Sequence, residues 1–298
     1  MKVGLSLLNL AGSMGTAIAA ATLLLAPTLG AQQVFRAGTQ AVLVDVLVTD
    51  RNRPVAGLTT ADFELRDNGV RQAIDSVSIG DMPMNAVLAL DMSASTAGPR
   101  LEHVRAASEA LLVGLRDGDR VALTTFNAAV APRVPLTGAF DQVRRALAAV
   151  TPVGETAILD GIFVALMTTQ REVGRAIVLL LTDGRDTSSW LDPDELLDSA
   201  KRSNAVVYSV ASGGAKQWAV LRDLADVTGG RVVEVESSAD LRATVQRLLD
   251  EFRSRYVITF TPKDVSSSGF HRLDVRTPRA NYTIRARPGY FGGGGNRP

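Results

Sequence analysis

The chain contains no cysteine, only two histidines and few aromatic residues, which make up 5% of its 298 residues. Without cysteine there is no disulfide and no thiolate metal site, so the fold depends on core burial and on any metal that it binds. His103 and His271 are far apart in sequence and lack metal-ligand spacing. The sequence also lacks GxSxG, HExxH and GxxxxGK[ST], which are the signatures of common hydrolases and nucleotide-binding enzymes.

The charged residues almost cancel, since 32 Lys and Arg face 31 Asp and Glu. A nucleic-acid-binding protein usually has a clear basic excess, so this balance does not suggest one. Hydrophobic residues make up 46% of the chain, which is enough for a sizeable core. The length suits one large domain or two of medium size.

The first 31 residues are predicted to be a secretory signal peptide. Lys2 is the only charge before Arg36, and the intervening segment is rich in Leu, Ala and Gly, which predicts cleavage after Ala31. Loss of Lys2 leaves 31 basic and 31 acidic residues. The alternative is an uncleaved anchor, because residues 3–33 carry no charge and are long enough to span a bilayer. We expect a secreted, periplasmic or cell-envelope protein that contacts the membrane only if this segment is retained.

Short segments typical of β-strands lie near both ends of the chain. Residues 40–49 are rich in Val and partly alternate, and Asn68-Gly69 separates two short runs in the manner of a hairpin. Partial alternation returns beyond residue 254. We predict that residues 34–82 and 253–291 fold together as one small antiparallel β-sandwich, followed by a flexible tail over residues 292–298.

Buried strands alternate with amphipathic helices through the middle of the chain. AIVLLL at 176–181 is the most apolar run after the N-terminal segment and predicts a central strand. A very short link joins residues 120–126 to 130–136, so the second should return antiparallel as an edge strand, which also suits its prolines. Residues 83–252 are predicted to be an α/β domain, doubly wound around a mostly parallel six-stranded sheet and inserted in the sandwich.

Oxygen-bearing side chains follow two of these strands and precede one helix. Asp91, Ser93 and Ser95 follow the apolar run 86–90, Asp183 follows AIVLLL, and Thr156 lies in a loop before a helix. Each alone is ordinary capping or turn chemistry. Together, at the carboxyl ends of strands, they predict a site for a hard cation such as Mg²⁺, which takes about six oxygens at roughly 2.0–2.1 Å.

The pattern DxSxS, then Thr, then Asp resembles the metal-ion-dependent adhesion site of von Willebrand factor A domains, and the resemblance covers about residues 84–252. It implies that Ser93 and Ser95 bind metal through their hydroxyls and that Thr156 binds directly or through water. It also implies that Asp91 and Asp183 act largely through water or hydrogen bonds. The flanking segments VDVLVTD, PVAGLTTADFELRDNG and YTIRARPGYF resemble the VWFA-related family described from acidobacteria, whose members are predicted to be exported.

The leading functional hypothesis is a binding module, not an enzyme, that captures a protein partner through Mg²⁺, with Mn²⁺ or Ca²⁺ as alternatives. Few anionic ligands would leave the cation electrophilic, with one position open to an Asp or Glu of the partner. One alternative is a structural component of an envelope assembly, in which the metal only fixes the loops. A metal-dependent hydrolase is disfavoured, because the motif surrounds the cation only with Ser, Thr and water.

Several neighbouring residues are expected to have ordinary roles. Asp160 and Glu155 are predicted to be solvated acids, and Arg185 with Asp186 a surface ion pair. Trp218 is expected to pack in the core, whereas recognition and packing are equally open for Trp190.

Overall fold

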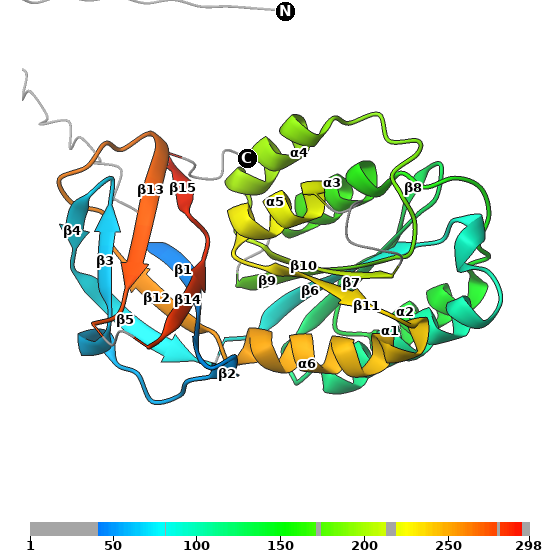
Figure 1. Ribbon diagram of the computed structural model, residues 1–298, viewed down its shortest axis with the longest axis horizontal. Helices are drawn as coiled ribbons and strands as arrows, with labels where there is room; N and C mark the ends of the chain where they lie inside the picture. The colour runs from blue at the N-terminus through cyan, green and yellow to red at the C-terminus, as the bar shows by residue number, and fades with distance from the viewer. Residues whose placement is uncertain (1–40, 81, 171–173, 213–218, 279–280, 294–298) are drawn as a thin grey trace, which may run out of the picture. The chain divides into compact units, whose positions relative to one another are not determined.

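The computed structural model describes residues 41–80, 82–170, 174–212, 219–278 and 281–293. The predicted signal peptide and Trp218 lie outside these residues. Within the described part of the chain, no helix has both the length and the apolar character needed to cross a membrane. The described residues form a six-stranded sheet flanked by helices and two separate antiparallel sheets (Figure 1).

The six-stranded sheet has the order β11-β10-β9-β6-β7-β8. Its inner strands pair in parallel, while β8 pairs antiparallel with β7 at the edge, as the short link and the prolines predicted. Every residue of β6 and β9 is buried, which explains their nearly unbroken apolar sequences. The strands are β6 (Met84–Asp91), β7 (Arg120–Phe126), β8 (Val130–Thr137), β9 (Arg175–Thr182), β10 (Val206–Ser212) and β11 (Arg231–Val235).

Helices cover both faces of this sheet (Figure 1). Helices α1, α2 and α6 share one apolar cluster with alternate strand residues such as Leu88, and α3, α4 and α5 share the other with residues such as Val87. Helix α4 begins after Asp192, whose side chain accepts a hydrogen bond from the backbone N–H of Glu195 at 3.0 Å and so caps the helix. The helices are α1 (Pro99–Gly114), α2 (Phe140–Ala149), α3 (Ile158–Thr169), α4 (Pro193–Arg202), α5 (Ala219–Thr228) and α6 (Leu241–Arg253).

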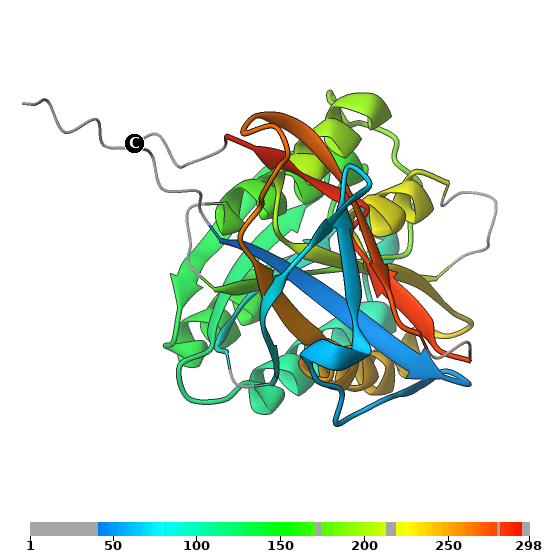
Figure 2. The ribbon, with the colours of Figure 1, turned by 90° about the vertical axis from the view of Figure 1, so that its left-hand side faces the viewer.

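The two antiparallel sheets each combine strands from both ends of the chain, which confirms the predicted inserted fold (Figures 1 and 2). Their facing side chains form one core that includes Val44, Leu65 and Phe260. One sheet has the order β14-β1-β12-β5, with β2 paired to β1, and the other has the order β15-β13-β3-β4. The N-terminal strands are β1 (Val42–Asp50), β2 (Arg53–Pro54), β3 (Glu64–Asp67), β4 (Val70–Gln72) and β5 (Ile74–Ile79); the C-terminal ones are β12 (Tyr256–Phe260), β13 (Gly269–Arg276), β14 (Thr283–Ala286) and β15 (Gly289–Gly292).

The hairpin between β3 and β4 turns at Asn68 and Gly69, whose φ angles of 47° and 85° are those that a type I′ turn requires. Strand β15, in contrast, was not predicted, because its sequence GYFG has no alternation and two glycines. Gly289 is required there, since a Cβ would lie 2.3 Å from the backbone oxygen of His271 on β13. Close approach of two backbones therefore selects glycine within this strand.

Candidate metal centre

The carboxylate of Asp91 lies at the carboxyl end of β6, next to the end of β9. Asp91 is only 2% exposed. Its Oδ1 accepts a hydrogen bond from the backbone N–H of Ser93 at 2.9 Å, and its Oδ2 accepts one from the hydroxyl of Thr182 at 2.6 Å. Because β6 and β9 are parallel neighbours, the residues that follow them meet at the same edge of the sheet.

The two predicted serines connect Asp91 to Asp183. The hydroxyls of Ser93 and Ser95 lie 3.0 Å apart, and the Ser95 hydroxyl donates to Asp183 Oδ1 at 2.9 Å. Ser93 occupies the N-cap of the short 3₁₀ turn Ala94–Thr96, yet its side chain makes no cap hydrogen bond. The serine hydroxyls therefore face the acidic cluster and do not close a helix end.

Thr156 approaches the same place from the loop before α3. A Cβ added to Gly184 would lie 3.2 Å from Thr156 Oγ1 and 3.6 Å from Asp91 Oδ2, so both oxygens face this glycine. Thr156 is buried, and the residue that caps α3 is Ala157, without a side-chain hydrogen bond. The threonine hydroxyl is therefore not a helix cap, and the structure brings all five predicted residues together.

The donor set is made only of oxygens, from two carboxylates and three hydroxyls, which suits a hard divalent cation. Asp91, Ser93 and Thr156 are buried, whereas Ser95 is exposed, so the cluster has one side open to solvent. Gly184 contributes space, because any side chain there would press on Thr156. No group of three or more His, Cys, Asp or Glu suited to a metal lies among the described residues, and this cluster itself has only two acids. The residues fit a divalent ion.

The electrostatics of the cluster also favour a cation. Burial raises the pKa of Asp91 above its usual value, hydrogen bonds from Thr182 and Ser93 oppose that shift, and the nearby negative charge of Asp183 adds to it. A carboxylate whose ionised form is destabilised in this way gains from a positive charge close to it. The cluster therefore favours the binding of a positive charge at this edge of the sheet.

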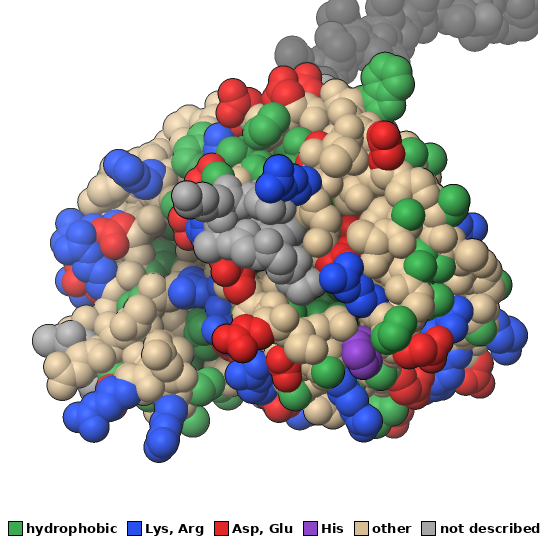
Figure 3. Space-filling view, turned by 45° about the vertical axis from the view of Figure 1, so that its right-hand side comes forward, with side chains coloured by type: hydrophobic (Ala, Val, Ile, Leu, Met, Phe, Trp, Pro, Cys, Tyr) green, Lys and Arg blue, Asp and Glu red, His purple; other side chains and the backbone are tan. Residues whose placement is uncertain are grey.

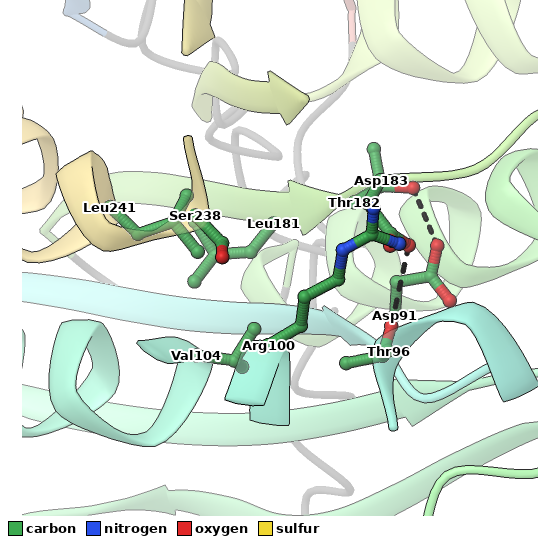
Figure 4. A pocket seen from close by; sticks show the side chains of 9 residues that line it. All are labelled: Asp91, Thr96, Arg100, Val104, Leu181, Thr182, Asp183, Ser238 and Leu241. Carbon is green, nitrogen blue, oxygen red and sulfur yellow. Dashed lines mark hydrogen bonds and ion pairs between the residues drawn. The ribbon is translucent and has the colours of Figure 1, made fainter. Parts of the chain in front are cut away.

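Arg100, in the first turn of α1, supplies such a charge from the chain itself. Its Nη1 donates to Asp183 Oδ2 at 2.6 Å and to the backbone oxygen of Ser95 at 3.1 Å. Figure 4 shows its side chain reaching over the cluster beside Thr182. It also lines a cavity of about 20 Å³, with room for roughly one water molecule. Sequence reasoning missed Arg100, because a lone arginine in a first helical turn gives no signal.

Two acids connect the loop after Asp183 to the start of α3 by hydrogen bonds. The sequence predicted a solvated acid and a surface ion pair at these two positions. Asp160 accepts hydrogen bonds from the backbone N–H groups of Trp190 and Leu191, both at 3.0 Å. Asp186 accepts from the backbone N–H of Ile158 at 2.7 Å. These acids therefore anchor a loop that presents Trp190, which is 94% exposed. The prediction of a solvated acid was incomplete, because only the fold brings the loop to Asp160.

Comparison with known proteins places this arrangement in a family. The family model for the von Willebrand factor type A domain matches residues 85–247, and the chain belongs to this family. Domains of the family are generally interaction modules and commonly bind a divalent metal. A search of curated protein sequences gives no match to the chain.

Several solved structures share the fold. Proximal thread matrix protein 1 from the mussel byssus, with a zinc-occupied metal-ion-dependent adhesion site, is 19% identical with a TM-score of 0.53; the match covers 63% of this chain and 50% of that one. A second crystal form of the mussel protein is 18% identical with a TM-score of 0.52, covering 61% and 48%. A von Willebrand factor type A protein from Catenulispora acidiphila is 14% identical with a TM-score of 0.51, covering 80% and 74%. The chain thus spans about half the length of the mussel protein, and at these identities the likeness shows the fold alone.

Proposed function

We propose that this chain is an exported interaction module that binds a protein partner through a divalent metal ion held by Asp91, Ser93, Ser95, Thr156 and Asp183. The observation that carries the proposal is the proximity of these five side chains, which come from three separate loops. Hydrogen-bond distances link Ser93, Ser95 and Asp183, while Asp91 and Thr156 both approach Gly184. In this proposal the ion supplies an electrophilic centre for an oxygen ligand. Residues 1–31 direct export, residues 83–252 carry the site, and residues 34–82 with 253–291 form the supporting sandwich.

The chemistry of the cluster favours recognition of a carboxylate. The serine and threonine hydroxyls are neutral, so only two negative charges offset a divalent ion. The exposed position of Ser95 leaves the cluster accessible from solvent. An Asp or Glu side chain of a partner fits this open side, because its charge complements that of the ion.

The surface around the domain supports a protein partner more than a nucleic acid. On the described part of the face in Figure 3, acidic and basic side chains are interspersed and no continuous basic area is visible. This agrees with the near-equal numbers of basic and acidic residues in the sequence. A carboxylate presented by a folded protein is therefore the ligand class we favour.

The first test is direct metal binding. Isothermal titration with Mg²⁺, Mn²⁺ and Ca²⁺ should show one site per chain, and Zn²⁺ belongs in the series because the mussel structure carries zinc in its site. Asp91→Ala and Thr156→Val should abolish or greatly weaken binding. Asp141→Asn is a matched control, since its side chain is 76% exposed on α2, where it pairs with Arg144. Wild-type affinity in Asp91→Ala would contradict the assignment.

The second test concerns the partner. Capture from the native cell envelope should be lost with EDTA and with Asp91→Ala, and restored by added metal. A large thermal stabilisation by metal, with no metal-dependent partner, would instead favour the structural role. Turnover of phosphoesters or peptides that disappears in Asp183→Ala would favour a hydrolase.

A further inference from the structure

The guanidinium of Arg100 and the candidate metal would use the same carboxylate. Both oxygens of Asp183 are already engaged, Oδ1 by the Ser95 hydroxyl at 2.9 Å and Oδ2 by Arg100 Nη1 at 2.6 Å. The Asp183 side chain is 10% exposed, whereas that of Arg100 is 52% exposed. The acid is therefore largely buried, whereas the guanidinium that pairs with it is half exposed to solvent.

We propose that Arg100 competes with the divalent ion for Asp183 and thereby sets the affinity of the site for metal. This inference rests on the proposed function, because it concerns the same site. Arg100 lies outside the DxSxS, Thr and Asp pattern, and in this proposal its positive charge weakens metal binding.

Charge is the first reason for this sign. Asp91 and Asp183 together carry two negative charges when ionised, and Arg100 reduces the net charge of the cluster to one. A divalent ion then enters a less negative site and is repelled by a guanidinium that contacts one of its proposed ligands. In high dielectric, one unit charge at this range changes the affinity for a dication by roughly tenfold, and added salt reduces the effect.

Exchange of Arg100 for a metal ion at Asp183 is also feasible, because the guanidinium can leave the carboxylate without being buried elsewhere. Half of the Arg100 side chain already faces solvent, and ion pairs with so exposed a member hold weakly. Its second contact, to the backbone oxygen of Ser95 at 3.1 Å, involves no side chain of the cluster. Arg100 can therefore swing out while Asp91, Ser93 and Thr156 stay in place.

The experiment is isothermal titration of Mg²⁺ and Mn²⁺ into the wild-type protein and charge variants at position 100. Arg100→Gln should bind each metal about tenfold more tightly at about 50 mM salt, and the gain should fall to about twofold near 1 M salt, where the Debye length is about 3 Å. Arg100→Lys keeps the charge and should stay within about twofold of wild type. Arg100→Met, which keeps an apolar stem beside the cavity, replaces the glutamine variant if that variant fails to fold.

Arg105→Gln is the matched control. Arg105 lies on the same helix and has a 31% exposed side chain, which pairs with Glu102 at 3.0 Å and donates to the backbone oxygen of Ala148 at 3.2 Å. Its loss should leave metal affinity unchanged. Thermal unfolding without metal will show whether any change in affinity follows from a change in folding.

The outcomes separate this inference from the proposed function. If wild type binds metal and Arg100→Gln binds it equally or more weakly, the competition by Arg100 is refuted and the metal site stands. If neither protein binds Mg²⁺ or Mn²⁺ at millimolar concentrations, the metal site itself is wrong and both ideas fail. Binding by Arg100→Gln alone would support competition in its strongest form.

Discussion

Asp91 illustrates how burial of one carboxylate carries a cost to folding. It is 2% exposed, and burial is the main reason why its pKa is raised. A carboxyl whose folded pKa lies above its unfolded value lowers stability at neutral pH, where it is ionised. That loss disappears as pH falls through the raised folded pKa, because the folded state then takes up the proton more readily.

Asp91→Asn should therefore not destabilise the metal-free protein at pH 7 and should stabilise it slightly, because the amide carries no charge to desolvate. The gain should shrink as the pH falls towards the range in which Asp91 is protonated. Stabilisation by Mg²⁺ should be lost at every pH. Urea unfolding between pH 4 and 8, with and without Mg²⁺, measures all three effects. A loss above 2 kcal/mol without metal would show that the carboxylate serves mainly to fold the loop.

A second buried acid, Asp67 of β3, contacts two polar side chains inside the terminal sheets. It is 0% exposed, lies 2.9 Å from His271 Nδ1 and accepts a hydrogen bond from the Tyr290 hydroxyl at 2.7 Å. Burial, followed by the hydrogen bond to Asp67, raises the pKa of Tyr290, so this hydroxyl stays protonated and keeps donating. The cluster connects β3, β13 and β15 within one sheet.

Asp67→Ala should destabilise the protein by about 3–5 kcal/mol, because it leaves His271 and Tyr290 buried without their shared acceptor. Tyr290→Phe removes one donor and should cost about 1–2 kcal/mol. Asp274→Asn is the control, since Asp274 lies on β13 with a 40% exposed side chain. Chemical denaturation provides the values, and a cost below 1 kcal/mol for Asp67→Ala would disprove the role.

At the scale of elements, periodicity and strand ends predicted most of the α/β domain. Unbroken apolar runs identify β6 and β9, and residues directly after them must lie at one edge of the sheet, which is why Asp91 and Asp183 could be predicted to meet. Arg100, Asp160 and Asp186 could not be predicted, because their partners come from segments that only the tertiary fold brings close. Strand β15 escaped detection because close approach of the His271 backbone, not side-chain alternation, selects Gly289.

The loop from Asp183 to Leu191 provides an element-scale prediction. Asp160→Ala removes the acceptor of the Trp190 and Leu191 amides, so hydrogen exchange at these two amides should accelerate by at least tenfold. Asp160→Asn retains one carbonyl acceptor and should have an intermediate effect. Asp198→Asn, an exposed acid on α4, is the control. Unchanged exchange in Asp160→Ala would mean that other contacts hold the loop.

At the scale of the whole described structure, the α/β sheet and the terminal sheets meet at a junction that contains a buried arginine. Arg175 begins β9 and is 4% exposed. Its Nε donates to Asp45 Oδ1 of β1 at 2.8 Å, its Nη2 donates to the Phe252 backbone oxygen of α6 at 2.8 Å, and its guanidinium lies 4.3 Å from the centre of the Phe252 ring. One side chain therefore joins three elements that belong to both structural parts.

Arg175→Leu should cost about 3–5 kcal/mol of unfolding free energy, because Asp45 then becomes a nearly buried charge without its partner. Adding Asp45→Asn should recover a large part of that loss, since the unpaired charge is what destabilises the junction.

The exposed pair Arg222 and Glu234 provides the matched comparison: its side chains are 46% and 42% exposed, and Arg222→Gln should cost at most about 1 kcal/mol. Urea unfolding followed by both fluorescence and circular dichroism gives the energies and tests whether the two parts unfold together. If the two probes report one coincident transition in the wild type but separate transitions in Arg175→Leu, this junction is the source of the cooperativity between the two parts. Equal small losses of unfolding free energy for Arg175→Leu and Arg222→Gln would show that the two parts are stabilised independently of the junction.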